Sequence, residues 1–415
     1  MIINAQQIIE AVNVYDVLKD FIDLKKRGTS YTGCCPFHDE KTPSFSVSPV
    51  KNIYKCFGCG AGGNAVTFLM EHEKMSFPEA IKRLSQYCNI AVEYKEMTEK
   101  EKSAYELREK DKAASYVLMR QINKYYYAQT WAGVSLLDSE NVIVDNRVFT
   151  WKTIQAFQIS FAPNGTIIKN ISEQQWSKDQ LLKIGIVKSG EKGAYDFFRD
   201  RTLFPVFDAQ GKICGFSGRK LSDNINKQNP KYINTPETAI YNKAKLLFGL
   251  YQSRKAIQKR GRAYLTEGAT DVISLHNFGI ENVVAPCGTA LTRQQVKLLK
   301  RFTNFAVLLY DGDKAGKKAI EKNTPMLLKE GMKVRVVILP DGEDPDSFIR
   351  RVGTKMFKDY CDSKLNQFDP IYWIMEQNWE DREDPFEKEY VMDLAASLLS
   401  YIPSSTVMET YLKAL

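Results

Sequence analysis

Three short apolar runs, each leading into an acidic turn, constrain the fold of this chain more than any other feature. The runs are Ala263–Thr266, Phe305–Tyr310 and Val334–Leu339, and the acidic turns are Glu267-Gly268, Asp311-Gly312-Asp313 and Asp344-Pro345-Asp346. Short apolar runs bounded by turn residues are typical of buried strands. The sequence therefore predicts three buried parallel strands that end in carboxylates.

Helical patterns separate these strands and have recognisable ends. Thr292 and Gln295 fit a capping box ahead of an apolar helical pattern. Gly279 and Gly331 lie where the C-terminus of a helix favours a left-handed residue. We therefore expect strand and helix to alternate from about residue 263 to residue 351.

The acidic turns predict a metal site. In an open α/β sheet, functional groups collect outside the carboxyl ends of the strands, so the three turns should converge. Mg²⁺ prefers carboxylate oxygens, and two such ions can stabilise the attacking and leaving oxygens of a phosphoryl transfer. Nucleotidyl transfer and phosphodiester cleavage both fit. Any one of these acidic turns, taken alone, is more often an ordinary turn without a functional role.

A second metal site is predicted near the N-terminus. Two residues separate Cys35 from His38, seventeen residues follow, and Cys56 and Cys59 form another pair with the same spacing. Two short ligand pairs joined by a connection long enough for two strands are typical of a closed, structural Cys3His zinc site that holds one Zn²⁺. Cys34 is expected to be a bystander thiol.

Basic and aromatic residues surround these zinc ligands. They are Lys25, Lys26, Arg27, Tyr31, Phe37, Lys41, Phe45, Lys51, Tyr54, Lys55 and Phe57. Aromatic faces stack on exposed bases while lysine and arginine follow phosphates, so the pattern predicts a surface for single-stranded nucleic acid. A solvated charge run over a small aromatic core is the alternative for each residue.

The acidic segments resemble a known domain through their order. Glu267-Gly268, then Gly288–Thr292, then Asp311–Gly316, then Pro340–Asp346 resembles the Toprim domain of bacterial DnaG-type primases, topoisomerases and some nucleases. Toprim membership alone does not choose among these chemistries.

Sequence around the zinc ligands makes the choice. Cys35–Phe45 and Tyr54–Gly60 resemble the zinc-binding domain of bacterial DnaG-type primases nearly letter for letter. Tyr195–Arg201, Gly215–Arg219 and Lys231–Thr238 are similar to the primase subdomain that precedes Toprim. The resemblance covers essentially the whole chain.

The resemblance implies a DNA-dependent RNA primase that joins ribonucleoside triphosphates on a single-stranded DNA template. Its catalytic residues would be Glu267, Asp311, Asp313, Asp344 and Asp346, and Mg²⁺ or Mn²⁺ would bind Glu267, Asp311, Asp313 and Asp344. A basic groove for template and primer would contain Arg147, Arg199, Arg201, Arg219, Lys231 and Lys243. Arg199 and Arg201 could instead form structural salt bridges. The alternative function is a DNA-cleaving Toprim enzyme of the nuclease or topoisomerase kind.

This chain departs from the family pattern at several positions. Ala269 and Thr270 follow Glu267-Gly268 where the family usually has an aromatic residue and Met, and Asn64 replaces a usual Asp. Asn146 and Val148 flank Arg147 where the family often reads Arg-Gly. None of these departures removes a predicted metal ligand.

Composition agrees with this interpretation. At 415 residues the chain exceeds one ordinary core, and a net charge of +8 with a pI near 8.8 mildly favours a polyanionic partner. No apolar run is long enough to span a membrane, and scattered cysteines without a signal peptide predict a cytoplasmic protein. We expect a monomer. A replicative helicase is a possible partner, although its usual binding domain is not recognised in the chain.

The expected architecture is a multidomain protein of the α+β and α/β classes. It comprises an N-terminal zinc ribbon, a mixed α/β basic subdomain, a Toprim parallel-sheet domain and a C-terminal helical segment. The predicted boundaries are 1–95 for the zinc-binding domain, 96–115 for a charged helical linker, 116–245 for the basic subdomain, 246–355 for Toprim and 356–415 for the helical segment.

Overall fold

The chain was analysed as a computed structural model, which divides into two compact units, Met1–Arg108 and Glu109–Leu415. The described residues are 2–38, 40, 42–73, 75, 77–94, 98–129, 135–136, 141–144, 147–174, 176–191, 193–220, 230–288, 290–365, 369–381, 383–402, 408–409 and 411. Lys41 and Asn146, singled out in the sequence, lie outside them. The predicted domain boundaries remain predictions.

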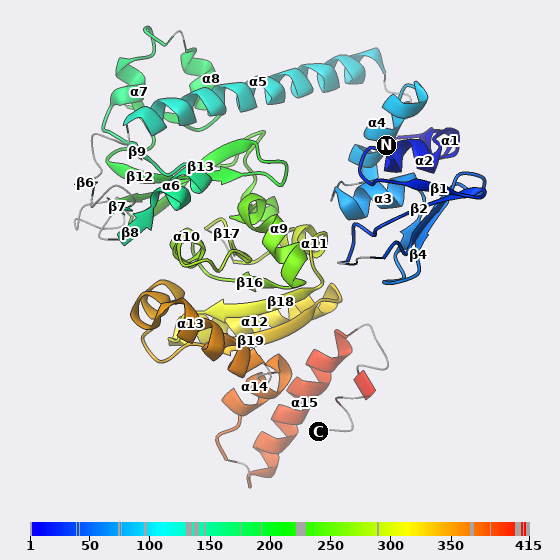
Figure 1. Cartoon of the computed structure of the whole chain (residues 1–415). Coiled ribbons are helices and arrows are strands. Elements are labelled where there is room, and N and C mark those ends of the chain that lie inside the picture. The colour runs from blue at the N-terminus through cyan, green and yellow to red at the C-terminus, as the bar shows by residue number, and fades with distance from the viewer. Residues whose placement is uncertain are drawn as a thin grey trace. The chain divides into compact units, whose positions relative to one another are not determined.

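The first unit is a small antiparallel sheet packed against short helices (Figure 1). Its elements are α1 (Ala5–Ala11), α2 (Val14–Leu18), β1 (Lys25–Arg27), β2 (Ser30–Gly33), β3 (Phe45–Ser48), β4 (Ile53–Cys56), β5 (Gly62–Gly63), α3 (Ala65–His72) and α4 (Phe77–Cys88). The strands pair in sequence order, β1-β2-β3-β4-β5. The two strands expected between the ligand pairs are thus β3 and β4. Asn64 caps α3, because its Oδ1 accepts the Thr67 N–H at 3.0 Å.

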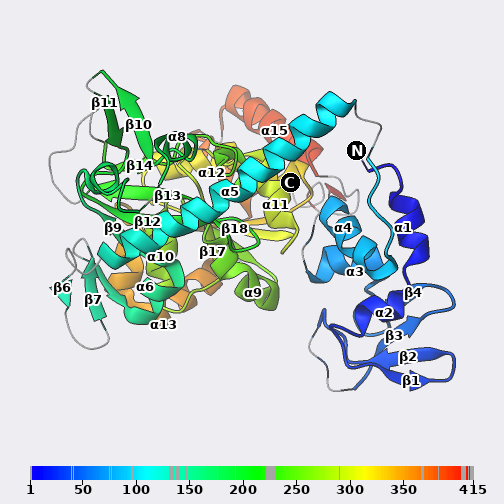
Figure 2. The same ribbon diagram turned by 90° about the horizontal axis from the view of Figure 1, so that it is seen from above.

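A single helix of 31 residues, α5 (Glu99–Gln129), begins in the first unit and ends in the second. Its N-terminal half carries alternating lysine and glutamate and is exposed, which confirms the predicted charged helix in this part of the chain. Its C-terminal half becomes apolar and runs over β12 and β13 (Figures 1 and 2). There the ring of Tyr126 meets Phe216 edge-on with centroids 5.8 Å apart.

The second unit begins with small antiparallel sheets. Its first elements are β6 (Ser135–Leu136), β7 (Asn141–Val144), β8 (Arg147–Thr150), α6 (Trp151–Phe157), β9 (Ser160–Ala162), α7 (Thr166–Lys169), α8 (Lys178–Lys183), β10 (Val187–Gly190), β11 (Gly193–Asp196), β12 (Arg201–Phe207), β13 (Ile213–Lys220) and β14 (Tyr232–Asn234). The main sheet has the order β14-β13-β12-β9. Three strands, β6, β7 and β8, form a second sheet, and β10 and β11 form a hairpin.

A mixed, mainly parallel sheet follows. It is built from η2 (Lys243–Lys245), β15 (Leu247–Phe248), α9 (Leu250–Arg260), β16 (Ala263–Leu265), α10 (Ala269–Asn277), β17 (Val283–Pro286), α11 (Arg293–Lys300), β18 (Phe305–Tyr310), α12 (Lys314–Lys329), β19 (Lys333–Ile338) and α13 (Pro345–Leu365). The strand order is β15-β17-β16-β18-β19, and all neighbours pair in parallel except β15 with β17. The three strands predicted from the apolar runs are confirmed as β16, β18 and β19.

Helix ends in this sheet domain also agree with the sequence analysis. The capping box at Thr292 is present, since its hydroxyl accepts the Gln295 N–H and the Gln295 side chain accepts the Thr292 N–H. Gly279 and Gly331 take φ angles of 77° and 71°, the left-handed conformation that glycine adopts at little cost.

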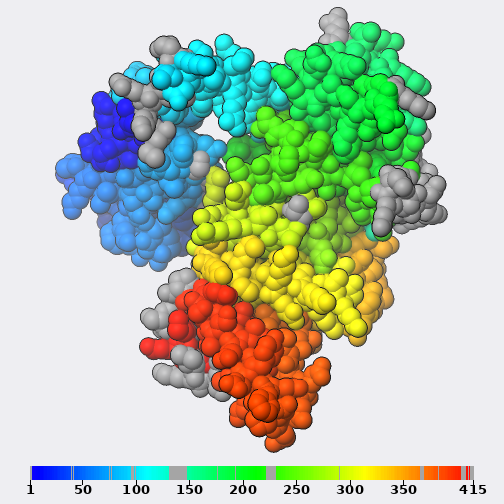
Figure 3. All heavy atoms as spheres, turned by 180° about the vertical axis from the view of Figure 1, so that it is seen from behind, coloured from blue at the N-terminus to red at the C-terminus, as the bar shows by residue number. Residues whose placement is uncertain are grey.

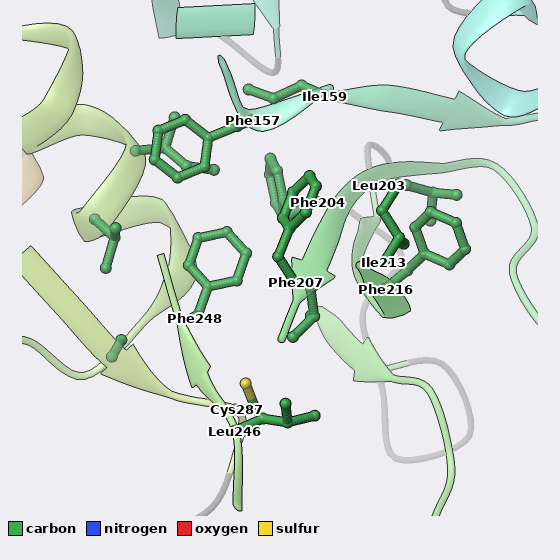
Figure 4. Packing of buried hydrophobic residues seen from close by; sticks show 14 of the residues in the cluster. Phe157, Ile159, Leu203, Phe204, Phe207, Ile213, Phe216, Leu246, Phe248 and Cys287 are labelled. Carbon is green, nitrogen blue, oxygen red and sulfur yellow. The ribbon is translucent and has the colours of Figure 1, made fainter. Parts of the chain in front are cut away.

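One apolar core joins the antiparallel sheet to the mainly parallel sheet (Figure 4). Phe204 and Phe207 of β12 face Phe248 of β15 across this core, and Phe157 stacks on Phe248 with ring centroids 6.0 Å apart. Because the aromatic residues are buried from both sides, the two sheets cannot separate without exposing a large apolar surface. Residues of the two sheets are therefore held in fixed relation within this unit.

The helical segment after the sheet packs against it. It contains α14 (Pro370–Gln377) and α15 (Pro385–Ser400), and Figure 3 shows the orange and red atoms of this segment beside the yellow atoms of the sheet domain. Ala395, Leu398, Leu399 and Ile402, predicted to share one face, are all buried in the core with β18 and β19. Nowhere in the described ranges is a helix both long and apolar enough to cross a bilayer.

Candidate active site and zinc centre

Parallel pairing brings the acidic turns to one edge of the sheet. Leu265 of β16 lies beside Leu308 of β18, and Tyr310 at the end of β18 lies beside Ile338 at the end of β19. Glu267, Asp311 and Asp344 all follow these carboxyl ends. Burial raises the pKa of Asp311 to about 7, with further contributions from the charges of Glu267, Asp344 and Asp313. The predicted convergence of the acids is confirmed.

The pKa values of two more carboxyl groups, Glu267 and Asp271, are raised in the same surroundings. Desolvation by the surrounding protein raises the pKa of Glu267, although the backbone N–H of Asp311 donates to this carboxylate and opposes the rise. Asp271 was not predicted as a site residue. Burial, followed by the charges of Asp311 and Asp344, raises its pKa well above its ordinary value.

The sequence around Asp271 contains a feature that could have indicated this residue. It lies three residues after Gly268, at the third position of α10, and its Oδ2 accepts the Gly268 N–H at 3.0 Å. Such a contact is half of a capping box, so the residue could be taken for a helix cap. Only the long-range neighbours, Asp311 and Asp344, show that it belongs to the acidic cluster.

Two of the acids also cap helices. Asp313 Oδ1 accepts the N–H groups of Ala315 and Gly316 at 2.9 and 2.8 Å, and Asp344 Oδ1 accepts the Ser347 N–H at 2.6 Å. Capping of this kind is the structural role that single acidic turns commonly have. It also aims each carboxylate, because one oxygen is held by the helix N-terminus.

Asp311 fits a cation better than any hydrogen-bond donor nearby. Its Oδ1 is buried, and among the described residues it has no hydrogen-bond partner. A buried acceptor without a hydrogen-bond partner is unfavourable, whereas a carboxylate oxygen is a good ligand for a hard divalent cation. The acid side chains are not gathered as tightly as the zinc ligands: within the described ranges no group of three carboxylates has its ligand atoms all within 4.8 Å.

The structure corrects the role predicted for Asp346. Its side chain is only 1% exposed and lies between two arginines, with Arg147 Nε at 2.7 Å and Arg350 Nε at 2.9 Å. The Ser274 hydroxyl also donates to it at 2.6 Å. The sequence counted Asp346 among the catalytic residues, but its carboxylate is enclosed by protein donors.

Arg201 requires a second correction. It is 4% exposed, and its guanidinium donates to the backbone oxygens of Gly218, Pro230 and Lys231 at 2.9 to 3.2 Å. A buried guanidinium that binds carbonyls holds the β13 and β14 backbones together and cannot contact a phosphate in solvent. The alternative for Arg201 was a structural salt bridge; the contacts that the structure describes are also structural, but they are made to backbone carbonyls.

The other predicted groove residues lie nearer the surface. Arg199 and Lys231 are exposed, while Arg219 and Lys243 are half-buried. Arg219 and Lys231 approach the ring of Tyr232 at 5.8 and 6.0 Å from its centroid. Arg219 on β13 and Lys231 just before β14 therefore place positive charge on this side of the antiparallel sheet.

Tyr232 links that sheet to the acidic edge. Its hydroxyl lies 3.3 Å from Thr270 Oγ1, one residue before Asp271. Thr270 is one of the departures from the family pattern, and here it gives the tyrosine a hydrogen-bond partner. The departure therefore does not disrupt the packing beside Glu267.

The zinc ligands lie in the geometry that the metal requires. Cys35 Sγ is 3.8 Å from Cys59 Sγ, and Cys56 Sγ is 3.8 Å from His38 Nδ1. A tetrahedral Zn²⁺ with Zn–S bonds of about 2.3 Å separates its sulfur ligands by roughly 3.8 Å. All four ligand atoms lie within 4.8 Å of one another, so the residues present fit one structural zinc ion. Cys34 is exposed and outside this group.

Glu40 ties the zinc knuckle together. One oxygen accepts the N–H groups of Cys35 and Ser44 at 2.6 and 3.1 Å, and the other lies 3.2 Å from His38 Nε2. His38 therefore presents Nδ1 to the metal while its other ring nitrogen faces a carboxylate. Such outer contacts orient metal ligands and make the imidazole a better donor.

The aromatic residues near the zinc site divide into two groups. Phe45 and Tyr54 are buried and stack with centroids 5.1 Å apart, so for them the core interpretation was right. Phe57 is 78% exposed. It lines a shallow hollow together with Lys51 and Lys55, which keeps a basic and aromatic surface on one face of the sheet.

Comparisons with known proteins agree with this layout. Three family descriptions match: a CHC2 zinc finger over residues 3–100, the N-terminal domain of the DNA primase catalytic core over residues 138–254, and a Toprim-like domain over residues 264–349. The zinc-binding and RNA polymerase domains of Aquifex aeolicus primase form a similar structure, with a TM-score of 0.60 and 30% identity over 99% of this chain and 95% of that chain. A DnaG primase catalytic domain bound to single-stranded DNA has a TM-score of 0.63 at 30% identity, covering 73% of this chain and 97% of that chain.

Curated relatives named DNA primase align over most of the chain. The Haemophilus influenzae protein is 35% identical over 403 residues, covering 94% of this chain and 65% of the relative. The Escherichia coli K12 protein is 33% identical over 405 residues, covering 95% and 67%. The chain thus spans about two thirds of the length of these relatives.

The zinc ribbon, the antiparallel sheet and the acidic parallel sheet define a zinc-bearing Toprim protein of the primase type. The chain belongs to the bacterial DnaG-type DNA primase family.

Replacement of Glu40 by Gln should weaken zinc binding. The amide keeps the shape of the side chain but removes the negative charge beside His38 Nε2. We expect about a 10- to 100-fold loss of zinc affinity, measured by competition with a chromophoric chelator. Glu10→Gln on the exposed face of α1 is the control and should not change the affinity. Equal affinities of the Glu40 variant and the native chain would contradict the orienting role.

Replacement of Asp311 by Asn should stabilise the protein in chelator above neutral pH. The folded pKa of about 7 lies above the ordinary value of 3.8, so the folded state holds a proton that the unfolded state releases. The contribution of Asp311 to the free energy of unfolding is then most favourable below about pH 4 and is lost as the pH rises toward 7. Asn does not titrate, so the variant does not lose this stability. The difference in the free energy of unfolding between the variant and the native chain should therefore grow across that pH window to on the order of 1 kcal/mol after allowance for solvent screening. Chemical denaturation at pH 5 and pH 8 measures it, and an advantage that is independent of pH would refute the assignment.

Proposed function

We propose that this chain is a DNA-dependent RNA primase, which synthesises short RNA primers on single-stranded DNA for replication. The observation that carries the proposal is the buried, unpartnered Oδ1 of Asp311 within a cluster of acids at the carboxyl ends of parallel strands. Family membership supports synthesis as the direction of the chemistry. The proposed substrates are ribonucleoside triphosphates and a DNA template strand.

We assign the acids different parts in nucleotidyl transfer. Asp311, Asp313 and Asp344 would hold Mg²⁺ or Mn²⁺, which when bound supplies the positive charge that stabilises the attacking and leaving oxygens. Glu267 would join them or accept the proton of the primer 3′-hydroxyl, a role that its raised pKa favours. Asp271 is buried close to these acids, and its strongly raised pKa favours the neutral, protonated form when no cation is bound.

Template binding is assigned to the basic and aromatic surfaces. Arg199, Arg219, Lys231 and Lys243 would follow phosphates along the antiparallel sheet. In the zinc unit, exposed Phe57 would stack on a template base, with Lys51 and Lys55 beside the backbone. A similar DnaG primase catalytic domain is bound to single-stranded DNA in its own structure, which supports this class of ligand.

A DNA-cleaving Toprim enzyme would use the same acids. The family matches over the zinc ribbon and the primase core favour synthesis over cleavage. We propose that the protein acts in the bacterial cytoplasm at the replication fork and works as a monomer. A replicative helicase as partner remains a prediction.

Asp311→Asn should abolish primer synthesis. The variant removes the charge that holds the cation while leaving the basic surfaces intact, so labelled ribonucleotide incorporation on a single-stranded template should fall at least about 100-fold. Template affinity, measured by fluorescence anisotropy, should stay within about twofold. Asp341→Asn is the matched control, since Asp341 lies on the same edge with a 92% exposed side chain. Normal synthesis by the Asp311 variant would overturn the assignment, and Mg²⁺-dependent nicking of plasmid without synthesis would favour cleavage.

Phe57→Ala should weaken template binding by the zinc unit. Loss of one base-stacking platform costs about 1 to 3 kcal/mol, so we expect a roughly 5- to 150-fold weaker affinity for a single-stranded oligonucleotide. Val50→Ala on the same exposed face is the control, with an 83% exposed side chain and no aromatic ring. Zinc content should be normal in both variants. An unchanged affinity would remove Phe57 from the template surface.

A further inference from the structure

The carboxylate of Asp346 is saturated by donors from three elements. Oδ1 accepts the Ser274 hydroxyl at 2.6 Å and Arg350 Nε at 2.9 Å. Oδ2 accepts Arg147 Nε at 2.7 Å and Arg350 Nη2 at 3.2 Å. The residue is 1% exposed, and it joins α10, α13 and the start of β8.

These contacts leave no place for a cation. A carboxylate has about four lone-pair positions, and four donor contacts occupy them here. Two guanidinium groups also place positive charge where a divalent ion would have to enter. Asp311 is the opposite case, because its buried Oδ1 has no partner among the described residues. The two acids therefore differ in function although both lie in acidic turns.

Arg147 is held close to the acidic cluster by this contact. Ser274 lies three residues after Asp271 on α10, so the two side chains share a face of the helix about one turn apart. The same helix anchors β8, since Asn277 Oδ1 accepts the Thr150 N–H at 2.8 Å and its amide donates to the Val148 oxygen at 3.2 Å. Arg147 opens this strand, and its guanidinium contacts Asp346, which also accepts the hydroxyl of Ser274, one helical turn from Asp271.

The charge of Arg147 is felt on the other side of the site as well. Burial raises the pKa of Tyr232, and the charges of Arg219 and Arg147 act in the opposite direction. Arg147 therefore contacts the buried Asp346 and is near enough to Tyr232 for its charge to act on the phenol. A guanidinium aimed by a buried carboxylate loses little freedom when it binds an anion, which is how arginine serves at phosphate sites.

We propose that Asp346 is a positioning residue that holds Arg147 at the edge of the metal centre, where Arg147 binds a phosphate of the incoming nucleoside triphosphate or of the nascent strand. This inference rests on the proposed function. Asp346 itself touches neither metal nor substrate. It offsets the charge of Arg147 and Arg350 in the ground state and sets the direction of the Arg147 side chain.

The decisive experiment compares Asp346→Asn, Arg147→Ala and the double variant. If Asp346 only positions Arg147, the Mg²⁺ concentration for half-maximal synthesis stays within about twofold in Asp346→Asn, and the double variant is no worse than Arg147→Ala alone. If Arg147→Ala and Asp346→Asn raise the KM for the nucleotide about tenfold and leave the primer-template affinity unchanged, Arg147 binds the triphosphate. A tenfold weaker primer-template affinity with unchanged KM identifies the strand. Arg351→Ala, which breaks the exposed pair of Arg351 with Glu343, is the control.

Two outcomes would overturn the inference. One is a tenfold higher Mg²⁺ requirement in Asp346→Asn, as expected of a metal ligand, and the other is independent, multiplicative losses in the double variant. Should Asp346→Asn fail to fold, Ser274→Ala removes one donor to Asp346 while leaving both arginines, and its KM or primer-template affinity should shift in the same direction by a few-fold.

A binding measurement separates this inference from the proposed function. Mg²⁺ should raise the melting temperature of Asp346→Asn as it does that of the native chain, and it should have no such effect on Asp311→Asn. This readout requires no synthesis. A chain that makes no primer but shows this pattern would refute the function and retain the structural role of Asp346.

Discussion

Parallel pairing of β16, β18 and β19 is the constraint on which the rest of the structure depends. It places the ends of three strands side by side and so gathers acids that are up to 77 residues apart in the sequence, from Glu267 to Asp344. The gathering is unfavourable in itself, because like charges in a partly desolvated edge repel one another. Backbone N–H groups at the starts of α12 and α13 offset part of this repulsion by holding Asp313 and Asp344.

The same edge shows how one residue type acquires opposite roles. Asp311 and Asp346 both follow strands in turns that look alike in the sequence. Asp311 keeps a buried oxygen without a donor, while Asp346 meets Arg147, 199 residues away, and Ser274, 72 residues away. The two acids differ because side chains from other elements donate hydrogen bonds to Asp346, whereas among the described residues none donates to Asp311 Oδ1. The core that contains Phe157, Phe207 and Phe248 holds those elements against the sheet.

Local signals in the sequence predicted most of the fold. Apolar runs gave the strands, Thr292 and Gly331 marked helix ends, and the spacing of Cys35, His38, Cys56 and Cys59 predicted the zinc site, because each signal is contained within a few residues. The failures were long-range. Arg201 reads as a surface cation, yet it binds carbonyls of β13 and of the segment entering β14. Asp271 reads as a helix cap, and only its neighbours on other strands assign it to the cluster.

Two glycines set the spacing of the acidic turns through the backbone alone. A Cβ on Gly312 would lie 2.3 Å from the Pro340 oxygen, and one on Gly316 would lie 2.1 Å from the Asp311 oxygen. The Gly312 N–H also donates to the Glu343 oxygen at 2.9 Å. The loops after β18 and β19 therefore touch main chain to main chain, with no side chain between them that could adjust. A side chain at Gly312 would push the loop after β19 away from the loop after β18, and one at Gly316 would displace the backbone of Asp311, so hydrogen at both positions fixes where the acids lie.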